Sequence, residues 1–236
     1  TRLPRGIDIV FCTYHLLVPS PAGRARTPVP LPLRAPALLV AALLFSLLPG
    51  PLSAATFTVN SSIDARDLNP GDGNCVAYLI VNPPFVFPFC TLRAAVEETN
   101  VLPGPDLIDI PYGTYRLTME GAGEDDNASG DLDITDSLTI TGAGTAETFL
   151  DAGGIDRMFD IRGDGVSVAI ADLTVGRGLV VPGNGQGGGA IRNRATLSLN
   201  RVAITGNSVQ DFPAGGHGGG IYNISVCRIA QSAISS

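Results

Sequence analysis

The stretch Gly188-Gly189-Ala190-Ile191-Arg192-Asn193 occurs again thirty positions later as Gly218-Gly219-Gly220-Ile221-Tyr222-Asn223. Short strands of alternating apolar residues follow both copies. Such a period is typical of a stacked coil, because a single turn cannot bury its apolar face without a neighbouring turn. Glycine at the corners permits backbone angles that a side chain would forbid. We therefore expect structurally equivalent positions at Gly188, Gly189, Ile191 and Asn193 in the first copy and at Gly218, Gly219, Ile221 and Asn223 in the second.

The apolar residues after each corner predict the register of the coil. Leu197, Leu199 and Ile204 should lie directly beneath Cys227, Ile229 and Ile234. A second match aligns residues 172–175 with 201–204 and with 137–140, at separations of 29 and 35. A sandwich or barrel would also contain many short strands, but not strands that recur with the same corner. The sequence predicts an all-β fold, a right-handed parallel β-helix over residues 106–236, with further strands at 107–110, 114–118, 132–134, 138–141, 158–161 and 166–175.

A short amphipathic helix is expected ahead of the coil. Thr91 can cap its N-terminus, and the apolar face at helical spacing comprises Leu92, Ala95, Val96 and Thr99. A helix here can cover the open end of the coil, where unpaired strand edges would invite aggregation. Together with an alternating strand at 56–60 and a turn-rich loop, it makes residues 56–105 the predicted N-terminal cap.

A secretory signal peptide is predicted over residues 34–55. A basic residue precedes an apolar run at 37–48, and the small residues Ser53 and Ala55 stand at positions −3 and −1 of a cleavage site after Ala55. The run is too short to span a bilayer comfortably, although an uncleaved membrane anchor stays open as the alternative. Residues 1–33 are expected to be a non-native upstream segment, and the last residues stop inside a strand, so we expect a coil truncated at its C-terminus.

The net charge and the cysteines of the chain exclude some classes of function. Beyond residue 55 the chain has 10 Arg, no Lys and 21 Asp plus Glu, a net charge of −11 (10 − 21). Such a domain repels nucleic acid, so no nucleic-acid partner is expected, and no later apolar segment is long enough to predict a membrane span. In an oxidising exterior, Cys75 and Cys90 would close a disulfide loop of about 15 residues. Cys227 replaces Leu197 of the preceding repeat, so we expect a small core residue there.

Residues 90–100, Cys-Thr-Leu-Arg-Ala-Ala-Val-Glu-Glu-Thr-Asn, resemble the N-terminal domain of the CSLREA-domain secreted bacterial proteins. The strand at 57–60, the loop at 69–75 and the segments 110–115 and 130–134 extend the resemblance over nearly all of 56–236. It implies a pectin-lyase-like right-handed parallel β-helix in an exported or surface protein, in a family whose members mostly have no assigned reaction. The family motif has Ser and Glu at the positions of Thr91 and Ala94, so one bond of a capping box is expected to be lost, at a cost of about 1 kcal/mol at most.

A cluster of acidic residues is a candidate calcium site. Asp125, Asp126, Asp131 and Asp133 offer hard oxygen ligands within ten residues, which is what Ca²⁺ coordination needs. The acidic loop at 67–73 is a second such cluster, without the bidentate Glu of an EF-hand. Solvated turns are the alternative in both places. No other cofactor is expected.

One histidine invites comparison with an enzyme family. Gly216-His217-Gly218 is similar to the Gly-His-Gly of polygalacturonases, but no pair of aspartates lies shortly before it, and Ala230 stands where that family has Lys. We therefore expect a solvated loop histidine. The predicted function is a non-catalytic cell-surface or extracellular module, structural or adhesive, that contacts polysaccharide or surface components. The alternative is a polysaccharide lyase or glycoside hydrolase acting on acidic polysaccharide, which the fold alone supports and which requires converging carboxylates and a basic residue in a groove.

Overall fold

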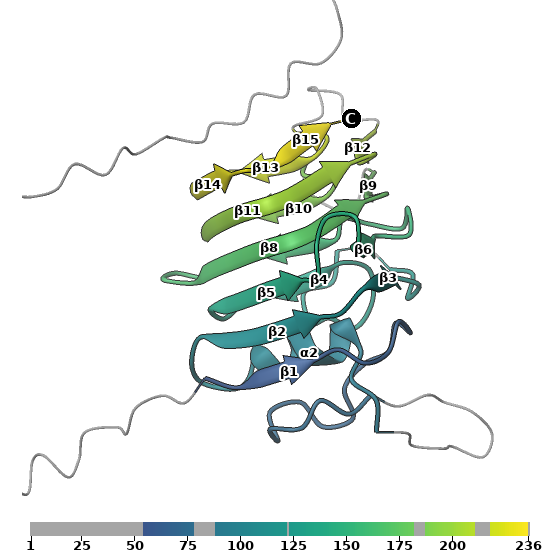
Figure 1. The fold of residues 1–236 in the computed structure, drawn as a ribbon, viewed down its shortest axis with the longest axis vertical. Coiled ribbons are helices and arrows are strands. Elements are labelled where there is room, and N and C mark those ends of the chain that lie inside the picture. Colours follow the sequence, from purple (N-terminus) through teal and green to yellow (C-terminus); the bar gives the residue numbers. More distant parts are fainter. Residues whose placement is uncertain (1–53, 78–87, 122, 182–186, 211–217, 236) are drawn as a thin grey trace, which may run out of the picture. The chain divides into compact units, whose positions relative to one another are not determined.

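The computed structural model describes residues 54–77, 88–121, 123–181, 187–210 and 218–235. In this part of the chain, parallel strands stack into a β-helix of about four turns with one short helix near its N-terminal end (Figure 1). The predicted fold class is confirmed. The predicted upstream segment, most of the predicted signal peptide and His217 lie outside the described residues.

Three sheets form the walls of the coil. The long sheet has nine strands, and its main path runs through β1 (Thr56–Thr58), β2 (Asp106–Ile110), β5 (Leu138–Gly142), β8 (Ser167–Gly176), β11 (Thr196–Thr205) and β14 (Val226–Ala230). It is completed by β3 (Gly113–Arg116), β6 (Thr148–Asp151) and β15 (Ala233–Ser235). The second sheet consists of β4 (Leu132–Ile134), β7 (Phe159–Ile161), β10 (Ile191–Asn193) and β13 (Ile221–Asn223). A third pairs β9 (Leu179–Val180) with β12 (Ser208–Val209).

The predicted register is confirmed at the C-terminal turns. Leu197 pairs with Cys227, Leu199 with Ile229 and Ile204 with Ile234. The same register continues downward and produces columns of inward side chains, one of which contains Ile108, Ile140, Ile170, Leu199 and Ile229. A fully buried aliphatic side chain of this size contributes about 1.5–3 kcal/mol, so these columns are the main source of stability in the coil.

One predicted alignment is wrong. Residues 172–175 do not stack on 137–140, because Leu138 pairs with Val168 and Ile140 with Ile170. Thr174 and Val175 instead pair with β6, a strand that the sequence pattern did not reveal. The cause is a difference in continuity: β8 runs through the corner as one strand, whereas the turn below breaks after β5 and resumes at β6.

The long strands bend at single residues with left-handed backbone angles. Asp172 of β8, Arg201 of β11 and Gln231 after β14 have φ of 59°, 53° and 50°. A side chain in this region costs about 1–2 kcal/mol, which the continuous pairing on either side of the bend offsets. Arg201 donates to both carboxylate oxygens of Asp172, so an exposed ion pair links the bends of two successive turns.

Glycine at the repeated corner meets a steric requirement. Gly188 and Gly218 have φ of 69° and 60°, and a Cβ on either would lie 2.3 or 1.9 Å from the carbonyl oxygen three residues later. Asn193 and Asn223, at the other end of the repeat, are register partners. The Asn193 amide donates to the Asn223 side-chain oxygen at 2.6 Å, so the two side chains form a ladder along the coil.

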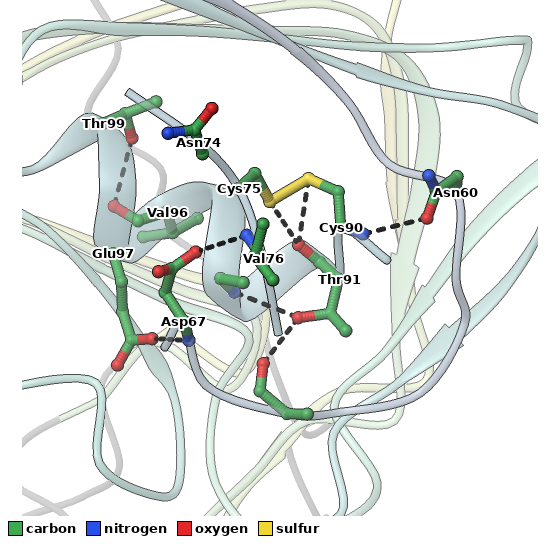
Figure 2. Close-up of a disulfide and its surroundings, with 12 residues drawn as sticks. Asn60, Asp67, Asn74, Cys75, Val76, Cys90, Thr91, Val96, Glu97 and Thr99 are labelled. Carbon is green, nitrogen blue, oxygen red and sulfur yellow. Dashed lines mark hydrogen bonds between the residues drawn. A yellow bond between two sulfur atoms is a disulfide. The ribbon is translucent and has the colours of Figure 1, made fainter. Parts of the chain in front are cut away.

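The helix α2 (Leu92–Thr99) covers the first turn, and its N-terminus adjoins the disulfide between Cys75 and Cys90 (Figure 2). Thr91 is the N-cap residue, and its hydroxyl accepts from the Ala94 amide at 3.1 Å. All eight helical residues are buried, so the polar face expected of an amphipathic helix does not reach solvent. No helix in the described part of the chain is long and apolar enough to cross a membrane.

The polar residues of α2 are buried because the preceding loop wraps around them. Glu98 accepts from the backbone amides of Gly71 and Gly73, and Glu97 accepts from the Asp67 amide at 2.6 Å. Burial raises the pKa of both glutamates, and these hydrogen bonds partly oppose the rise. Hydrogen bonds to buried glutamates therefore attach this loop to α2.

Candidate functional site

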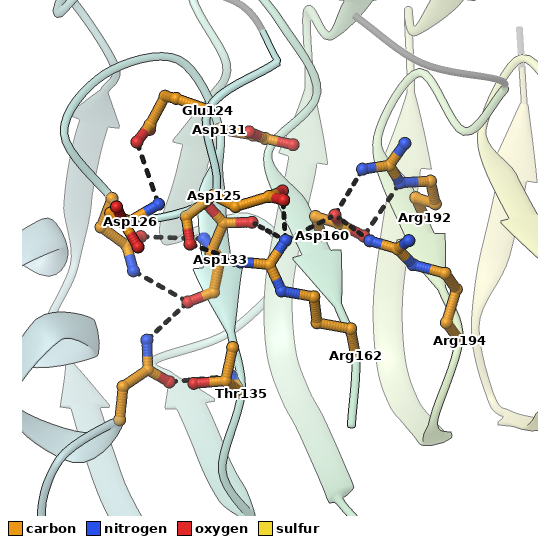
Figure 3. A network of polar contacts seen from close by, with 12 residues as sticks. Glu124, Asp125, Asp126, Asp131, Asp133, Thr135, Asp160, Arg162, Arg192 and Arg194 are labelled. Atoms are coloured by element: carbon orange, nitrogen blue, oxygen red, sulfur yellow. Dashed lines mark hydrogen bonds and ion pairs between the residues drawn. The ribbon is translucent and has the colours of Figure 1, made fainter. Parts of the chain in front are cut away.

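A row of charged side chains lies on the outward face of the second sheet. The central residues of its strands are register partners in the order Asp133, Asp160, Arg192 and Tyr222. Residues on either side of them, such as Leu132 and Ile134, are buried in the core, because side chains alternate across a strand. The turns of the coil thus bring together charges that are about 30 residues apart in the sequence (Figure 3).

Asp160 is the anchor of this cluster. Arg192 binds both of its carboxylate oxygens, and Arg194 donates to Oδ2 at 2.7 Å. Burial alone would raise the pKa of Asp160, but the hydrogen bond and charge of Arg192, together with Arg194, lower the pKa below its usual value. Asp160 therefore stays ionised and holds two arginines in place.

Asp133 has the opposite environment, although its strand is adjacent. Its side chain is 1% exposed, and neither carboxylate oxygen accepts a hydrogen bond from the described residues. Arg162 lies 3.4 Å from Oδ1 as an ion pair. Burial, followed by the negative charge of Asp131, raises the pKa of Asp133 to about 7, against the opposing effect of Arg162. Folding therefore favours the protonated form of this carboxyl group.

Asp125 completes a group of three carboxylates. Oxygens of Asp125, Asp133 and Asp160 all lie within 4.8 Å of one another, and Asp125 is the exposed member. The Arg162 guanidinium contacts all three and also binds the Asp125 carbonyl. This guanidinium supplies the positive charge that a metal ion would supply among the same carboxylates.

The predicted calcium ligands do not converge as a set of four. Asp125 and Asp133 belong to the carboxylate group, whereas Asp131 forms a buried ion pair with Arg157 at 2.8 Å. Burial and the neighbouring Asp156 raise the pKa of Asp131 to about 6. Asp126 is exposed, and its amide is held by Glu124. Sequence reasoning missed Asp160, since only the register of β4 and β7 brings it to the cluster.

Two asparagines fix the strand that carries Asp133. The side chain of Asn127 donates to the Asp133 carbonyl at 2.9 Å and accepts from its amide at 2.8 Å. Asn100, the C-cap residue of α2, donates to the same carbonyl and accepts from the Thr135 amide. These amides replace a neighbouring strand at the edge of β4, so the first turn presents few free backbone groups there.

A pocket of about 430 Å³ opens beside the cluster, between the cap and the first turn. Its volume lies in the usual range of ligand pockets. Its lining residues are mostly polar: Arg66, Pro70, Glu97, Asn100, Val101, Asp125, Asp126, Asn127, Thr135 and Arg162. Arg66 binds Glu97, and Arg162 binds Asp125, so two carboxylates of the lining are already paired with arginine.

The outward face of the long sheet has a different character. Its side chains between β5 and β11 are small, and they comprise Thr139, Thr141, Ala169, Ala171, Ser198 and Asn200. A flat face of small side chains lacks the carboxylate pair and the base that sugar-cleaving chemistry needs. The group of three carboxylates around Arg162 lies instead at the second sheet and the pocket next to it.

Comparison with family models, with curated proteins and with solved structures finds no match for this chain.

Proposed function

We propose that this chain is a non-catalytic, exported β-helix module that binds saccharide in the pocket between its cap and first turn. The observation that carries the proposal is the state of the charged lining: Glu97 and Asp125 are ion-paired with Arg66 and Arg162. These pairs hold two guanidinium groups at the pocket, and guanidinium and hydroxyl groups there can bind sugar hydroxyls and carboxylates. A structural or adhesive role at a cell surface agrees with this arrangement.

Binding can be measured by calorimetry with an oligogalacturonate and with a neutral oligosaccharide of the same length. Thr135 is exposed in the lining, so Thr135→Trp should fill the pocket without removing a charge and should abolish binding. Arg162→Gln should weaken the acidic ligand more than the neutral one. Arg201→Gln removes an exposed, ion-paired arginine elsewhere and should leave both affinities unchanged. Binding that survives Thr135→Trp would contradict the proposal.

The enzymatic alternative has one observation in its favour. The pKa of Asp133 is raised to about 7, while that of the adjacent Asp160 is lowered, and such divergent pairs serve acid–base catalysis. Both side chains are buried and face Arg162 instead of the pocket. Incubation with polygalacturonate decides between the functions: new reducing ends would indicate cleavage, and an unsaturated product would identify a lyase. Asp133→Asn should abolish either activity if the alternative is correct.

Calcium binding is a separate proposal for the same carboxylates. Asp125, Asp133 and Asp160 are suitable hard ligands, but an ion would have to displace the Arg162 guanidinium. If calcium stabilises the module, a chelator lowers the melting temperature, and the effect disappears in Asp125→Asn. An unchanged melting temperature would remove calcium from the proposal.

Export and family membership rest on different observations. The disulfide between Cys75 and Cys90 favours an oxidising compartment, and the apolar run at 37–48 supports a secretory signal. The resemblance to CSLREA-domain proteins rests on the residues of the cap and corner, and it stays part of the proposal. Secretion of the full chain into the medium or onto the surface of a bacterial host tests export directly.

A further inference from the structure

Ala55, the residue before β1, is held by the fold through three contacts. Its amide donates to Oδ1 of Asp106 at 2.7 Å, and its carbonyl accepts from the Leu107 amide at 2.9 Å. Its side chain packs against the hydrophobic core. Ala54, in contrast, is exposed. The edge of the folded coil therefore begins at Ala55.

Asp106 occupies a position that is apolar in every later turn. The register places it at the foot of an inward column that continues through Leu138, Val168, Leu197 and Cys227. Asp106 is 1% exposed, like the buried members of that column. A carboxylate in an apolar column is costly unless a positive charge and hydrogen bonds compensate for its burial.

The described residues satisfy only one of the two carboxylate oxygens of Asp106. Oδ1 of Asp106 accepts from Ala55, but Oδ2 is buried and accepts no hydrogen bond within the described ranges. Burial raises the pKa of Asp106, and the neighbouring charge of Asp136 raises it further. A positive charge at the position of the Ala55 nitrogen would therefore stabilise the ionised carboxylate of Asp106.

We propose that the Ala54–Ala55 peptide bond is a processing site, and that the new α-ammonium group of Ala55 pairs with Asp106. An endopeptidase adds water across the bond: Ala54 leaves with a carboxylate, and the Ala55 nitrogen becomes an ammonium group. One N–H keeps the bond to Oδ1, and the two additional hydrogens are available to Oδ2. The inference rests on the proposed export, which places the chain before such a peptidase.

The alternative site, after Ala55, fits the sequence pattern of small residues but not the fold. Cleavage there would remove all three contacts of Ala55 and would leave Asp106 buried without its hydrogen bond. Cleavage after Ala54 retains those contacts, with a small residue at position −1. The two sites differ by one alanine, so a mass measurement separates them.

The first experiment is N-terminal sequencing and intact mass of the chain secreted by a bacterial host. We expect Ala55 as the first residue. A secreted chain that begins at Thr56, or at any other residue, would overturn this inference and leave export intact. A chain that is neither exported nor processed would overturn both.

The second experiment uses the absence of lysine from the sequence. Because all 15 basic residues counted as Lys plus Arg are arginine, an amine-reactive acetylating reagent modifies only the α-amino group of the secreted chain. Pairing with Asp106 raises the pKa of that group, and a rise of one unit leaves about tenfold less of the reactive neutral amine. Labelling of the native chain should therefore be at least about tenfold slower than that of the urea-unfolded chain at the same pH.

Variants of one strand provide the matched comparison. Asp106→Asn should accelerate labelling of the native chain, whereas Asp109→Asn, at an exposed position of β2, should not. Acetylation in urea followed by refolding should lower the melting temperature of the wild-type chain and have little effect on Asp106→Asn. Because the ammonium pKa is raised by folding, this stabilisation is complete below the ordinary value of about 7.7–8.0 and disappears as pH rises through the folded value. Equal labelling of native and unfolded chains would refute the pairing.

Discussion

Replacing Arg93 by Met should destabilise the protein by about 3–5 kcal/mol, the usual cost of breaking a buried ion pair. The guanidinium of Arg93 is fully buried on α2 and forms a fork with both carboxylate oxygens of Asp64, at 2.7 and 3.2 Å. It also donates to the carbonyls of Asn127, Gly130 and Asp131, which belong to the loop that leads into β4. One side chain therefore joins the cap to the first turn.

The expected loss of stability in Arg93→Met follows from the groups that lose their partner. Methionine retains the apolar stem, so little packing is lost, but Asp64 keeps a buried charge and three carbonyls lose a donor. Asp64 still accepts from the amides of Thr118 and Met119, which limits the loss. The pair is coupled: Asp64→Leu combined with Arg93→Met should cost less than the sum of the two single changes, by about 0.5–3 kcal/mol.

The chain contains its own control for burial. Arg201 forms the same fork with Asp172, but its side chain is 50% exposed, against 0% for Arg93. Solvent screens an exposed pair of this kind, so Arg201→Met should leave stability close to that of the wild type. The comparison holds the chemistry constant and varies only the surroundings.

Urea denaturation followed by far-ultraviolet circular dichroism measures both effects, since the sequence has no Trp to report on unfolding. We expect the Arg93→Met transition at a clearly lower urea concentration than wild type, with Arg201→Met close to wild type. A loss of less than about 0.5 kcal/mol for Arg93→Met, the size of an ordinary surface change, would refute the assignment of Arg93 as the link between cap and coil.

Three further outcomes are expected. Replacing Cys75 and Cys90 by Ser should cost about 3 kcal/mol, since their loop spans 15 residues, and a reductant should reproduce the loss in wild type during urea titration. Asp133 has its pKa raised to about 7 on folding, so its contribution to stability should fall as pH rises from about 4 through 7. Asp133→Asn should remove this contribution, and an identical pH dependence in the variant and the wild type would contradict the raised pKa. Asn193→Ala removes buried bonds to Ala195 and Asn223 and should cost about 1–3 kcal/mol in thermal unfolding, more than Asn223→Ala at the exposed end of the ladder.

The sequence determines the coil wherever a turn repeats with little change. The match of Leu197 with Cys227 follows from the repeat itself, because the corner glycines and the alternating apolar residues leave one register that buries both strands. The same reasoning fails for residues 137–140, since the turn below β8 is interrupted between β5 and β6, and Thr174 and Val175 pair with β6. Local pattern thus predicts pairing only between turns whose strands break at the same positions.

The candidate site is less accessible to sequence reasoning. Asp125 and Asp133 stand out as acidic residues close together in the chain, but their partners Asp160 and Arg162 come from the next turn. One usable signal is the spacing of Asp160 and Arg192, which occupy the middle of three-residue strands at corresponding repeat positions. Recognising it requires the register of the second sheet, which the repeat defines only between β10 and β13.

The polar residues of α2 are buried, although the sequence pattern alone would place them on a solvent-exposed helix face. The first turn of a parallel coil exposes backbone groups of β4 on the side where no earlier turn exists, and apolar side chains cannot satisfy those groups. The side chains of Asn100 and Asn127 pair with the backbone of Asp133, and Arg93 binds the carbonyls of the preceding loop. Such contacts require polar atoms at buried positions. The helix therefore carries Arg and Glu on a face that the hydrophobic pattern alone would place in solvent. Arg93 of α2 thus binds the loop that leads into the first turn, whereas Glu97 and Glu98 bind the loop that wraps around the helix.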